Sequence, residues 1–193
     1  MHGVVLCGGL SRRMGSPKAL LPWDGGTMLS HAVKRLQAAG LEPWCAGPPA
    51  WAVAAGCPHL DDDPPLAGPL GAIAAALRQG DAFVLAVDMP LLTPEEIVRL
   101  IQVGEAAQFA AVPIAAGGLQ PLAAFWPAYL LSYLRQYLAS GGRSVLSFLA
   151  QAPHIRLQEP DLVRLGVDPG HLRGCNTPEE YLALARGGGG EVP

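Results

Sequence analysis

The sequence predicts an α/β fold, a three-layer α/β/α sandwich around a mixed sheet that is mostly parallel. Two observations predict it: short apolar segments alternate with amphipathic ones, and half of the 193 residues are hydrophobic while 15% are charged. Such alternation is typical of parallel strands joined by helices, and this length suits one buried core. We expect a single domain over residues 1–186 and a flexible tail over residues 187–193, which begin with four glycines.

Individual elements follow from the periodicity of each segment and from the residues that bound it. Apolar segments between turn residues predict strands at 2–7, 43–46, 82–87, 109–114 and 121–126. Amphipathic spacing predicts helices at 27–39, 70–78, 93–102, 127–139, 144–151 and 178–186. Thr27, Thr93 and Thr177 are expected N-caps, and the last two precede Pro-Glu-Glu, which is typical of a first helical turn.

Charge and hydropathy exclude two classes of partner. The formal net charge is -3 and the sequence concentrates no basic face, which argues against a nucleic-acid binder. No charged residue occurs between Ala106 and Leu134, but prolines and glycines interrupt this stretch, so we expect two strands and a helix rather than a membrane span. The first residues lead straight into an apolar strand rather than a signal peptide. A cytoplasmic protein is therefore expected.

The cysteines and histidines show no pattern of a metal site. Cys7, Cys45, Cys57 and Cys175 are scattered, without the paired spacing of a zinc site or a disulfide framework. We expect all four to be free, buried residues of a reducing compartment. The five histidines likewise lack metal-ligand spacing.

Chemistry is concentrated in the loop that follows the first predicted strand. Gly8 and Gly9 let backbone N–H groups approach a phosphate without a Cβ in the way. Arg12, Arg13 and Lys18 follow; arginine bonds two phosphate oxygens at once, and lysine supplies a compact charge. The loop lacks both the Gly-Lys-Ser/Thr of a P-loop and the Gly-x-Gly-x-x-Gly of a dinucleotide fold. It therefore predicts a polyphosphate site of another kind.

Asp88 directly follows the clearest predicted strand. In a parallel sheet ligands bind at the carboxyl ends of the strands, where the loops after Cys7 and around Asp61 are also expected. A carboxylate in that position suits Mg²⁺, which bridges a protein carboxylate and a phosphate. The alternative is a turn aspartate before Pro90.

The segment from Leu6 to Lys18 also carries a resemblance. Its pattern Leu-x-Gly-Gly-x-x-x-Arg-Met-Gly-x-x-Lys is similar to the signature of molybdenum cofactor guanylyltransferases. More widely it resembles Rossmann-like nucleotidyltransferases of the glycosyltransferase-A type. The resemblance implies transfer of GMP from GTP to the phosphate of molybdopterin, which gives molybdopterin guanine dinucleotide and pyrophosphate. Other molybdenum-cofactor proteins are then expected as transient partners.

Alternatives to this activity remain open. In related enzymes Leu-Ala-Gly-Gly accompanies GTP and Leu-Ala-Ala-Gly accompanies CTP, so the Gly-Gly after Cys7 favours GTP. A cytidylyltransferase or a sugar-phosphate nucleotidyltransferase of the same fold is the nearest alternative. A non-catalytic nucleotide-binding adaptor is the third, and we expect such a protein to lack Lys18 or Asp88.

The resemblance implies roles for individual residues at the nucleotide. The expected nucleotide-binding residues are Leu6, Cys7, Gly8, Gly9, Lys18, Asp61 and Asp88. Asp62 is the alternative to Asp61. The expected catalytic residues are Arg13, Lys18 and Asp88, with Asp88 also binding Mg²⁺ and with Arg12 as the alternative to Arg13.

Three residues near the C-terminus are expected at the acceptor. Gln120 lies in a segment that resembles a strand pair beside the acceptor pocket, and Arg143 matches an arginine expected to meet the acceptor phosphate. Asn176 begins Asn-Thr-Pro-Glu-Glu, which is similar to a closing motif of the family. Helix capping is the alternative interpretation of Asn176.

Overall fold

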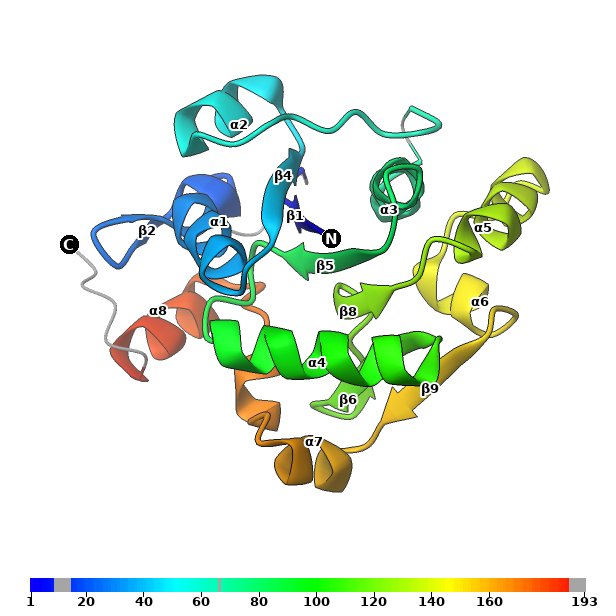
Figure 1. Ribbon diagram of the computed structural model, residues 1–193. Helices are drawn as coiled ribbons and strands as arrows, with labels where there is room; N and C mark the ends of the chain where they lie inside the picture. The colour runs from blue at the N-terminus through cyan, green and yellow to red at the C-terminus, as the bar shows by residue number, and fades with distance from the viewer. Residues whose placement is uncertain (9–14, 66, 188–193) are drawn as a thin grey trace.

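A computed structural model describes residues 1–8, 15–65 and 67–187 and shows a seven-stranded sheet between two layers of helices (Figure 1). Its strands are β1 (His2–Leu6), β4 (Glu42–Ala46), β5 (Ala82–Ala86), β6 (Ala110–Ala115), β7 (Gly118–Leu119), β8 (Ala123–Trp126) and β9 (His154–Leu157). Their order is β4-β1-β5-β8-β6-β7, with β9 also paired to β6. All but β7 and β8 run in one direction. The predicted α/β class and mostly parallel mixed sheet are confirmed.

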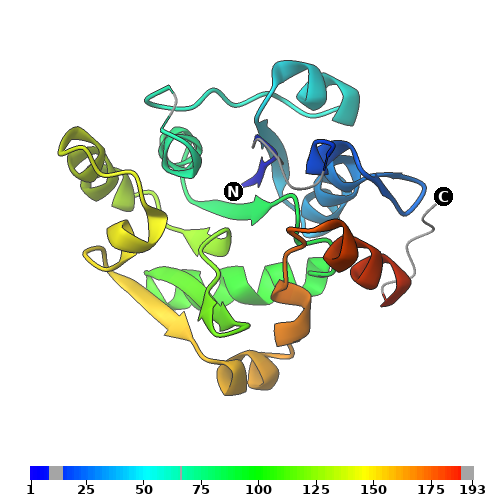
Figure 2. The same ribbon diagram turned by 180° about the vertical axis from the view of Figure 1, so that it is seen from behind.

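Helices cover both faces of this sheet. They are α1 (Met28–Ala38), α2 (Pro49–Ala55), α3 (Pro69–Leu77), α4 (Pro94–Ala107), α5 (Leu130–Ala139), α6 (Val145–Leu149), α7 (Glu159–Leu165) and α8 (Pro178–Gly187). Two 3-10 turns, η1 (Lys18–Leu20) and η2 (Pro169–Leu172), and a small hairpin of β2 (Pro22–Trp23) and β3 (Gly26–Thr27) complete the described chain. Figures 1 and 2 show α1 and α4 on one side of the sheet and α3, α5 and α6 on the other. No helix within the described ranges is long and apolar enough to cross a membrane.

The core consists of two clusters, one on each face of the sheet. Side chains alternate along a strand, so Val5 and Phe83 pack with α1 and α4, whereas their neighbours Val4 and Val84 pack with α3 and α5. Every residue of α3 after Pro69 is buried, as expected for a helix that other elements cover all round. The continuous apolar runs of the central strands therefore reflect burial on both faces.

Most predicted elements are present, and the exceptions have local causes. Thr27 and Thr93 are N-caps, as expected, and the structure shows that each also forms a capping box, with Ser30 and Glu96 respectively. The helix after Thr93 continues to Ala107 rather than to residue 102, and it ends where Gln108 adopts a left-handed conformation. The elements α2, β7, β9 and α7 were not predicted. They are short segments of two to seven residues, too short for a clear periodicity.

Two of the four cysteines form a disulfide. Cys45 in β4 and Cys57 after α2 are bonded, with their Cα atoms 6.5 Å apart. The reason is that α2 turns the chain back beside β4: the N–H of Cys45 donates to Pro58 O, and the N–H of Leu60 donates to Cys45 O, both at 2.9 Å. The prediction of four free cysteines is wrong for this pair. It holds for Cys7 and Cys175, which are free and buried.

We expect reduction of the Cys45–Cys57 bond to lower thermal stability. A cross-link over a short loop restricts the unfolded chain, and its loss costs roughly 3 kcal/mol. For a protein of this size that corresponds to a fall in Tm of about 6–12 °C. Thermal unfolding of the oxidised protein with and without a phosphine reductant measures the effect. Cys57→Ser is the control, because the reductant should not change the Tm of a variant that lacks the disulfide. An unchanged Tm after both thiols have been shown to be reduced would contradict the prediction.

Candidate active site

A cavity of about 700 Å³ lies at the carboxyl ends of the central strands. Its walls are Leu6, Cys7 and Gly8 at the end of β1, Ala46 and Gly47 at the end of β4, and Ala86, Val87 and Asp88 at the end of β5, together with Lys18, Asp62, Gly68, Pro69, Ala72 and Leu122. The three loops expected at one edge of the sheet therefore do meet there. Gly68 and Pro69 begin α3, so the positive end of that helix dipole lies at the cavity and favours an anion.

A second cavity of about 660 Å³ adjoins the first. The two share Ala86, Asp88 and Leu122 in their walls. Apolar residues form most of the second cavity, which is also lined by Gln120, Arg173, Asn176 and Glu180. Asp88 therefore lies between two adjoining spaces, each large enough for a small-molecule ligand.

Lys18, Asp88 and Asn176 meet at this boundary although they are far apart in the sequence. Lys18 Nζ lies 2.7 Å from Asp88 Oδ2 and 2.8 Å from Asn176 Oδ1. The side chains of Lys18 and Asp88 are only 15% and 20% exposed. Partial burial strengthens the charge-assisted contact. The structure thus brings together three of the residues expected at the site, from η1, the turn after β5 and the segment before α8.

The loop after β1 is held close to β4 by glycine. The N–H groups of Cys7 and Gly8 both donate to Ala46 O, at 2.9 and 3.1 Å. A Cβ on Gly47 would lie 2.6 Å from Cys7 Sγ, and one on Gly8 would lie 3.2 Å from the Cα of Gly47. Only glycine at position 47 permits this approach. Gly47 was not among the predicted site residues, although a glycine directly after a predicted strand is a signal present in the sequence.

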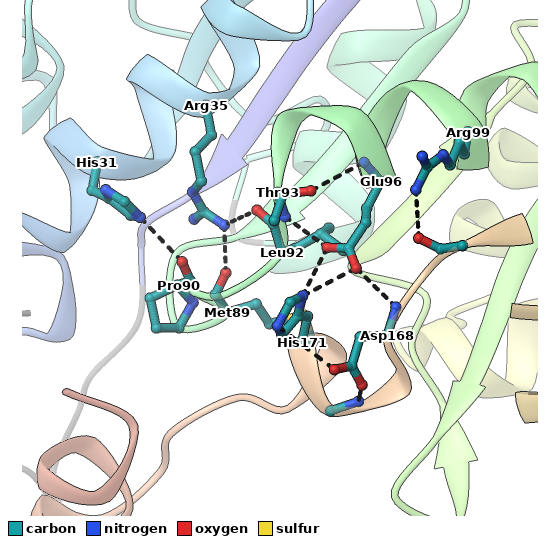
Figure 3. A network of polar contacts seen from close by, with 12 residues as sticks. His31, Arg35, Met89, Pro90, Leu92, Thr93, Glu96, Arg99, Asp168 and His171 are labelled. Atoms are coloured by element: carbon teal, nitrogen blue, oxygen red, sulfur yellow. Dashed lines mark hydrogen bonds and ion pairs between the residues drawn. The ribbon is translucent and has the colours of Figure 1, made fainter. Parts of the chain in front are cut away.

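The turn after Asp88 is braced by helix α1 (Figure 3). Arg35 is buried and donates from Nη1 to Met89 O and Leu92 O, at 2.9 and 2.7 Å. His31 Nε2 lies 3.1 Å from Pro90 O. Burial lowers the pKa of Arg35 to about 10, so the guanidinium stays charged at neutral pH. Three carbonyl groups of the turn are therefore bonded from α1.

A second brace joins α4 to the segment that leads to Asn176. Glu96 is buried and accepts from the N–H of Asp168 at 2.8 Å, and its carboxylate lies 3.0 Å from His171 Nδ1. Further along, the N–H of Cys175 donates to Asp88 O at 3.0 Å. The segment before Asn176 is thereby held at two places: Asp168 and His171 contact Glu96, and Cys175 contacts Asp88.

Of the two candidate acids before α3, Asp62 faces the first cavity. Asp62 lines that cavity, whereas the side chain of Asp61 is 95% exposed and lies 3.5 Å from His59 Nδ1. Burial, and secondly the charge of Asp61, raise the pKa of Asp62. The geometry thus favours Asp62 where the sequence favoured Asp61.

Of the remaining residues expected at the site, one lines a cavity, one does not, and three lie outside the described residues. Gln120 lines the second cavity and donates from Nε2 to Ala115 O at 3.0 Å. Arg143 lines neither cavity; its Nη1 donates to Leu138 O and Gly142 O at the end of α5. Gly9, Arg12 and Arg13 lie outside the described residues. Arg173, which sequence reasoning missed, does line the second cavity.

Fold and site together define an enzyme of the nucleotidyltransferase class. A cavity that favours an anion lies at the carboxyl edge of the sheet, a lysine and an aspartate line its wall, and a second cavity adjoins it. This arrangement suits the transfer of a nucleotide to an acceptor. Residues 3–155 match the family described as MobA-like NTP transferase domain, and the chain belongs to that family.

Relatives of this protein align with most of its sequence. The chain is 34% identical to the molybdenum cofactor guanylyltransferase of Rhizobium meliloti over 189 residues, which cover 92% of this chain and 87% of the relative. It is 35% identical to the protein of the same name from Cereibacter sphaeroides, over 83% of this chain and 86% of the relative.

Solved structures share the fold at lower identity. The molybdopterin-guanine dinucleotide biosynthesis protein A of Archaeoglobus fulgidus superposes with a TM-score of 0.80 at 23% identity, covering 96% of this chain and 97% of that one. A 2-C-methyl-D-erythritol 4-phosphate cytidylyltransferase from Thermus thermophilus gives a TM-score of 0.67 at 16% identity, covering 95% and 98%. A manganese complex of a Mycobacterium tuberculosis protein gives 0.62 at 21% identity, covering 96% and 97%.

Proposed function

We propose that this protein transfers GMP from GTP to the phosphate of molybdopterin and releases pyrophosphate. The observation that carries the proposal is the position of the Lys18–Asp88 pair at the boundary of two cavities. Each cavity takes one substrate, and the pair lies where their phosphates meet. The choice of substrates is supported by relatives named molybdenum cofactor guanylyltransferase at 34–35% identity.

The reaction needs little covalent chemistry from the protein. An oxygen of the acceptor phosphate attacks the α-phosphorus of GTP, the bond to the bridging oxygen of the β-phosphate breaks, and pyrophosphate leaves with that electron pair. Catalysis then consists of alignment and charge stabilisation. Lys18 stabilises the phosphate charge from the wall of the first cavity, and Arg13, which lies outside the described residues, is assigned the same role.

The residues at the boundary suit Mg²⁺. Asp88 offers carboxylate oxygens and Asn176 an amide oxygen, and both bond Lys18 Nζ, so they lie within reach of a common point. Mg²⁺ prefers oxygen ligands and takes only one or two carboxylates from the protein, with phosphates and waters as the others. Among the described residues, no three His, Cys, Asp or Glu side chains are grouped so that they could hold a metal ion. When bound, the ion neutralises phosphate charge.

Asp62 is assigned to the guanine base. A carboxylate accepts from the two adjacent N–H donors of guanine, and cytosine offers no such pair. Leu6, Cys7 and Gly8 line the same cavity, and their backbone groups are assigned to base and ribose. The assignment of the base to this cavity therefore predicts a preference for GTP over CTP.

Thermal unfolding with GTP, CTP, UTP or ATP in the presence of Mg²⁺ tests the nucleotide, because binding raises apparent stability with affinity. We expect the largest shift with GTP. Asp62→Asn should weaken GTP binding by at least ~10-fold through the loss of charged hydrogen bonds, whereas the exposed neighbour Asp61→Asn should leave it within about 2-fold. Since the pKa of Asp62 is raised, GTP affinity should also fall with acidification sooner than for an ordinary aspartate.

Opposite outcomes separate the alternatives. A shift that is strongest with CTP would replace guanylyl transfer by cytidylyl transfer. Equal losses in the Asp61 and Asp62 variants would remove the base assignment. Formation of the dinucleotide and pyrophosphate from molybdopterin and GTP, assayed without oxygen, would exclude a non-catalytic adaptor.

A further inference from the structure

We propose that Arg173 binds the phosphate of the acceptor and thereby sets the preference of the second cavity for a phosphomonoester. The inference rests on the proposed function, and it replaces Arg143 with Arg173 in the role that the sequence suggested. Three observations carry it: the place of Arg173 beside Asp88, the absence of a partner for its side chain among described residues, and the charge of the cavity wall.

Backbone contacts place Arg173 next to the reaction centre. Its own N–H bonds Gly170 O at the end of η2. The next residue, Gly174, packs against Asp88, since a Cβ there would lie 3.4 Å from the Asp88 carboxyl group. The N–H of Cys175 then bonds Asp88 O. Arg173 is therefore one residue removed from direct contact with Asp88, and its side chain lines the cavity.

The guanidinium of Arg173 has no assigned role within the fold. None of the hydrogen bonds or ion pairs between described residues involves its side chain, in contrast to Arg35, Arg78, Arg99 and Arg143. The residue is exposed at the cavity rather than packed into the core. Replacement of the side chain should consequently leave the folded structure unchanged.

Charge in the second cavity creates the need for such a cation. Two carboxylates, Asp88 and Glu180, line its wall, and either would repel an incoming phosphate. Lys18 neutralises Asp88, and Glu180 accepts from the N–H groups of Asn176 and Thr177. Arg173 is the one cation among the described residues of this wall.

Arginine also suits the chemistry of the acceptor. Its planar group bonds two oxygens of a phosphate at once, which fixes the orientation of the third oxygen. A phosphate held between Arg173 and the Lys18–Asp88 boundary would present that oxygen toward the first cavity. Arg143 cannot serve in this arrangement, because it lines neither cavity and bonds the carbonyl groups that end α5.

Steady-state guanylyl transfer by Arg173→Gln, Arg173→Lys and Arg143→Gln tests the proposal, with molybdopterin varied at saturating GTP. We expect Arg173→Gln to raise the KM for molybdopterin at least 10-fold, to lower kcat by a smaller factor because the attacking oxygen is less well oriented, and to leave the thermal shift with GTP intact. Arg173→Lys should recover part of the loss, because it restores the charge but not the paired hydrogen bonds. Arg143→Gln should keep the KM for molybdopterin of the wild type.

Any other outcome contradicts either the proposed function or the role of Arg173, as follows. If the wild-type protein binds GTP but does not convert molybdopterin, the proposed function fails and this inference fails with it. If the wild type is active and Arg173→Gln keeps its KM for molybdopterin, only the inference fails. A loss of folding in Arg173→Gln would assign the residue a structural role, and a loss of GTP binding in the folded variant would place it at the nucleotide. An equal effect of Arg143→Gln would restore the assignment made from sequence.

Discussion

Replacement of Asp88 by asparagine is expected to lower the rate of guanylyl transfer by at least ~10³-fold, with the fold intact. Asparagine keeps the shape of the side chain and an oxygen for Lys18 Nζ, now 2.7 Å away, but it removes the negative charge. The proposed Mg²⁺ then loses its carboxylate ligand, and Lys18 loses the ion pair that positions it. Removal of one group that stabilises charge in the transition state costs ~10²–10³-fold in other enzymes, and here two such groups are affected.

Release of pyrophosphate at saturating GTP and molybdopterin measures this loss. Asp61→Asn is the matched control, since it removes an aspartate charge from the same edge of the sheet but from a side chain that is 95% exposed. Thermal unfolding should place both variants within a few degrees of the wild type. A rate near that of the wild type in Asp88→Asn would remove both the metal assignment and the central place of the Lys18–Asp88 pair.

The elements that carry the site were predictable because their signals are local. Thr93 before Pro-Glu-Glu marks a helix start, and the apolar segment before Asp88 marks a buried strand, whatever the rest of the chain does. Parallel strands then bring the loops after Cys7 and Val87 to one edge, as observed. The contact between Lys18 and Asn176 was not predicted, because the two residues lie 158 positions apart and the resemblance placed one at the nucleotide and the other at the acceptor.

The sequence could not distinguish between neighbouring or similar residues, because their roles depend on the direction in which each side chain points. Asp61 and Asp62 are adjacent acids of equal chemistry, and only the path of the chain before α3 turns the second toward the cavity. Arg143 and Arg173 are both arginines near the acceptor segment, but the end of α5 bonds one of them and leaves the other at the cavity wall. The Cys45–Cys57 bond depends on α2, a seven-residue helix without clear periodicity.

Glu96→Ala should cause a large loss of stability although Glu96 lies outside the cavities. The carboxylate is 5% exposed and accepts from the N–H groups of Thr93 and Asp168, both at 2.8 Å, and lies 3.0 Å from His171 Nδ1 (Figure 3). Alanine leaves these buried donors without an acceptor. A lost capping interaction costs about 0.5–2 kcal/mol, and each buried group left unsatisfied costs about 1–3 kcal/mol.

We therefore expect Glu96→Ala to lower the free energy of unfolding by roughly 3–5 kcal/mol, measured by denaturant titration. Glu95→Ala is the matched control, because Glu95 lies in the same first turn of α4 but is exposed, so its loss should cost less than about 1 kcal/mol. Glu96→Gln should fall between them, since one amide oxygen still accepts from Thr93 while the new NH₂ group faces other donors. Equal stability of the Glu95 and Glu96 alanine variants would mean that the brace between α4 and the segment leading to Asn176 does not hold the fold.

With the brace lost, Gly174 and Cys175 would no longer be held against Asp88, so the KM for molybdopterin should rise in Glu96→Ala but not in Glu95→Ala.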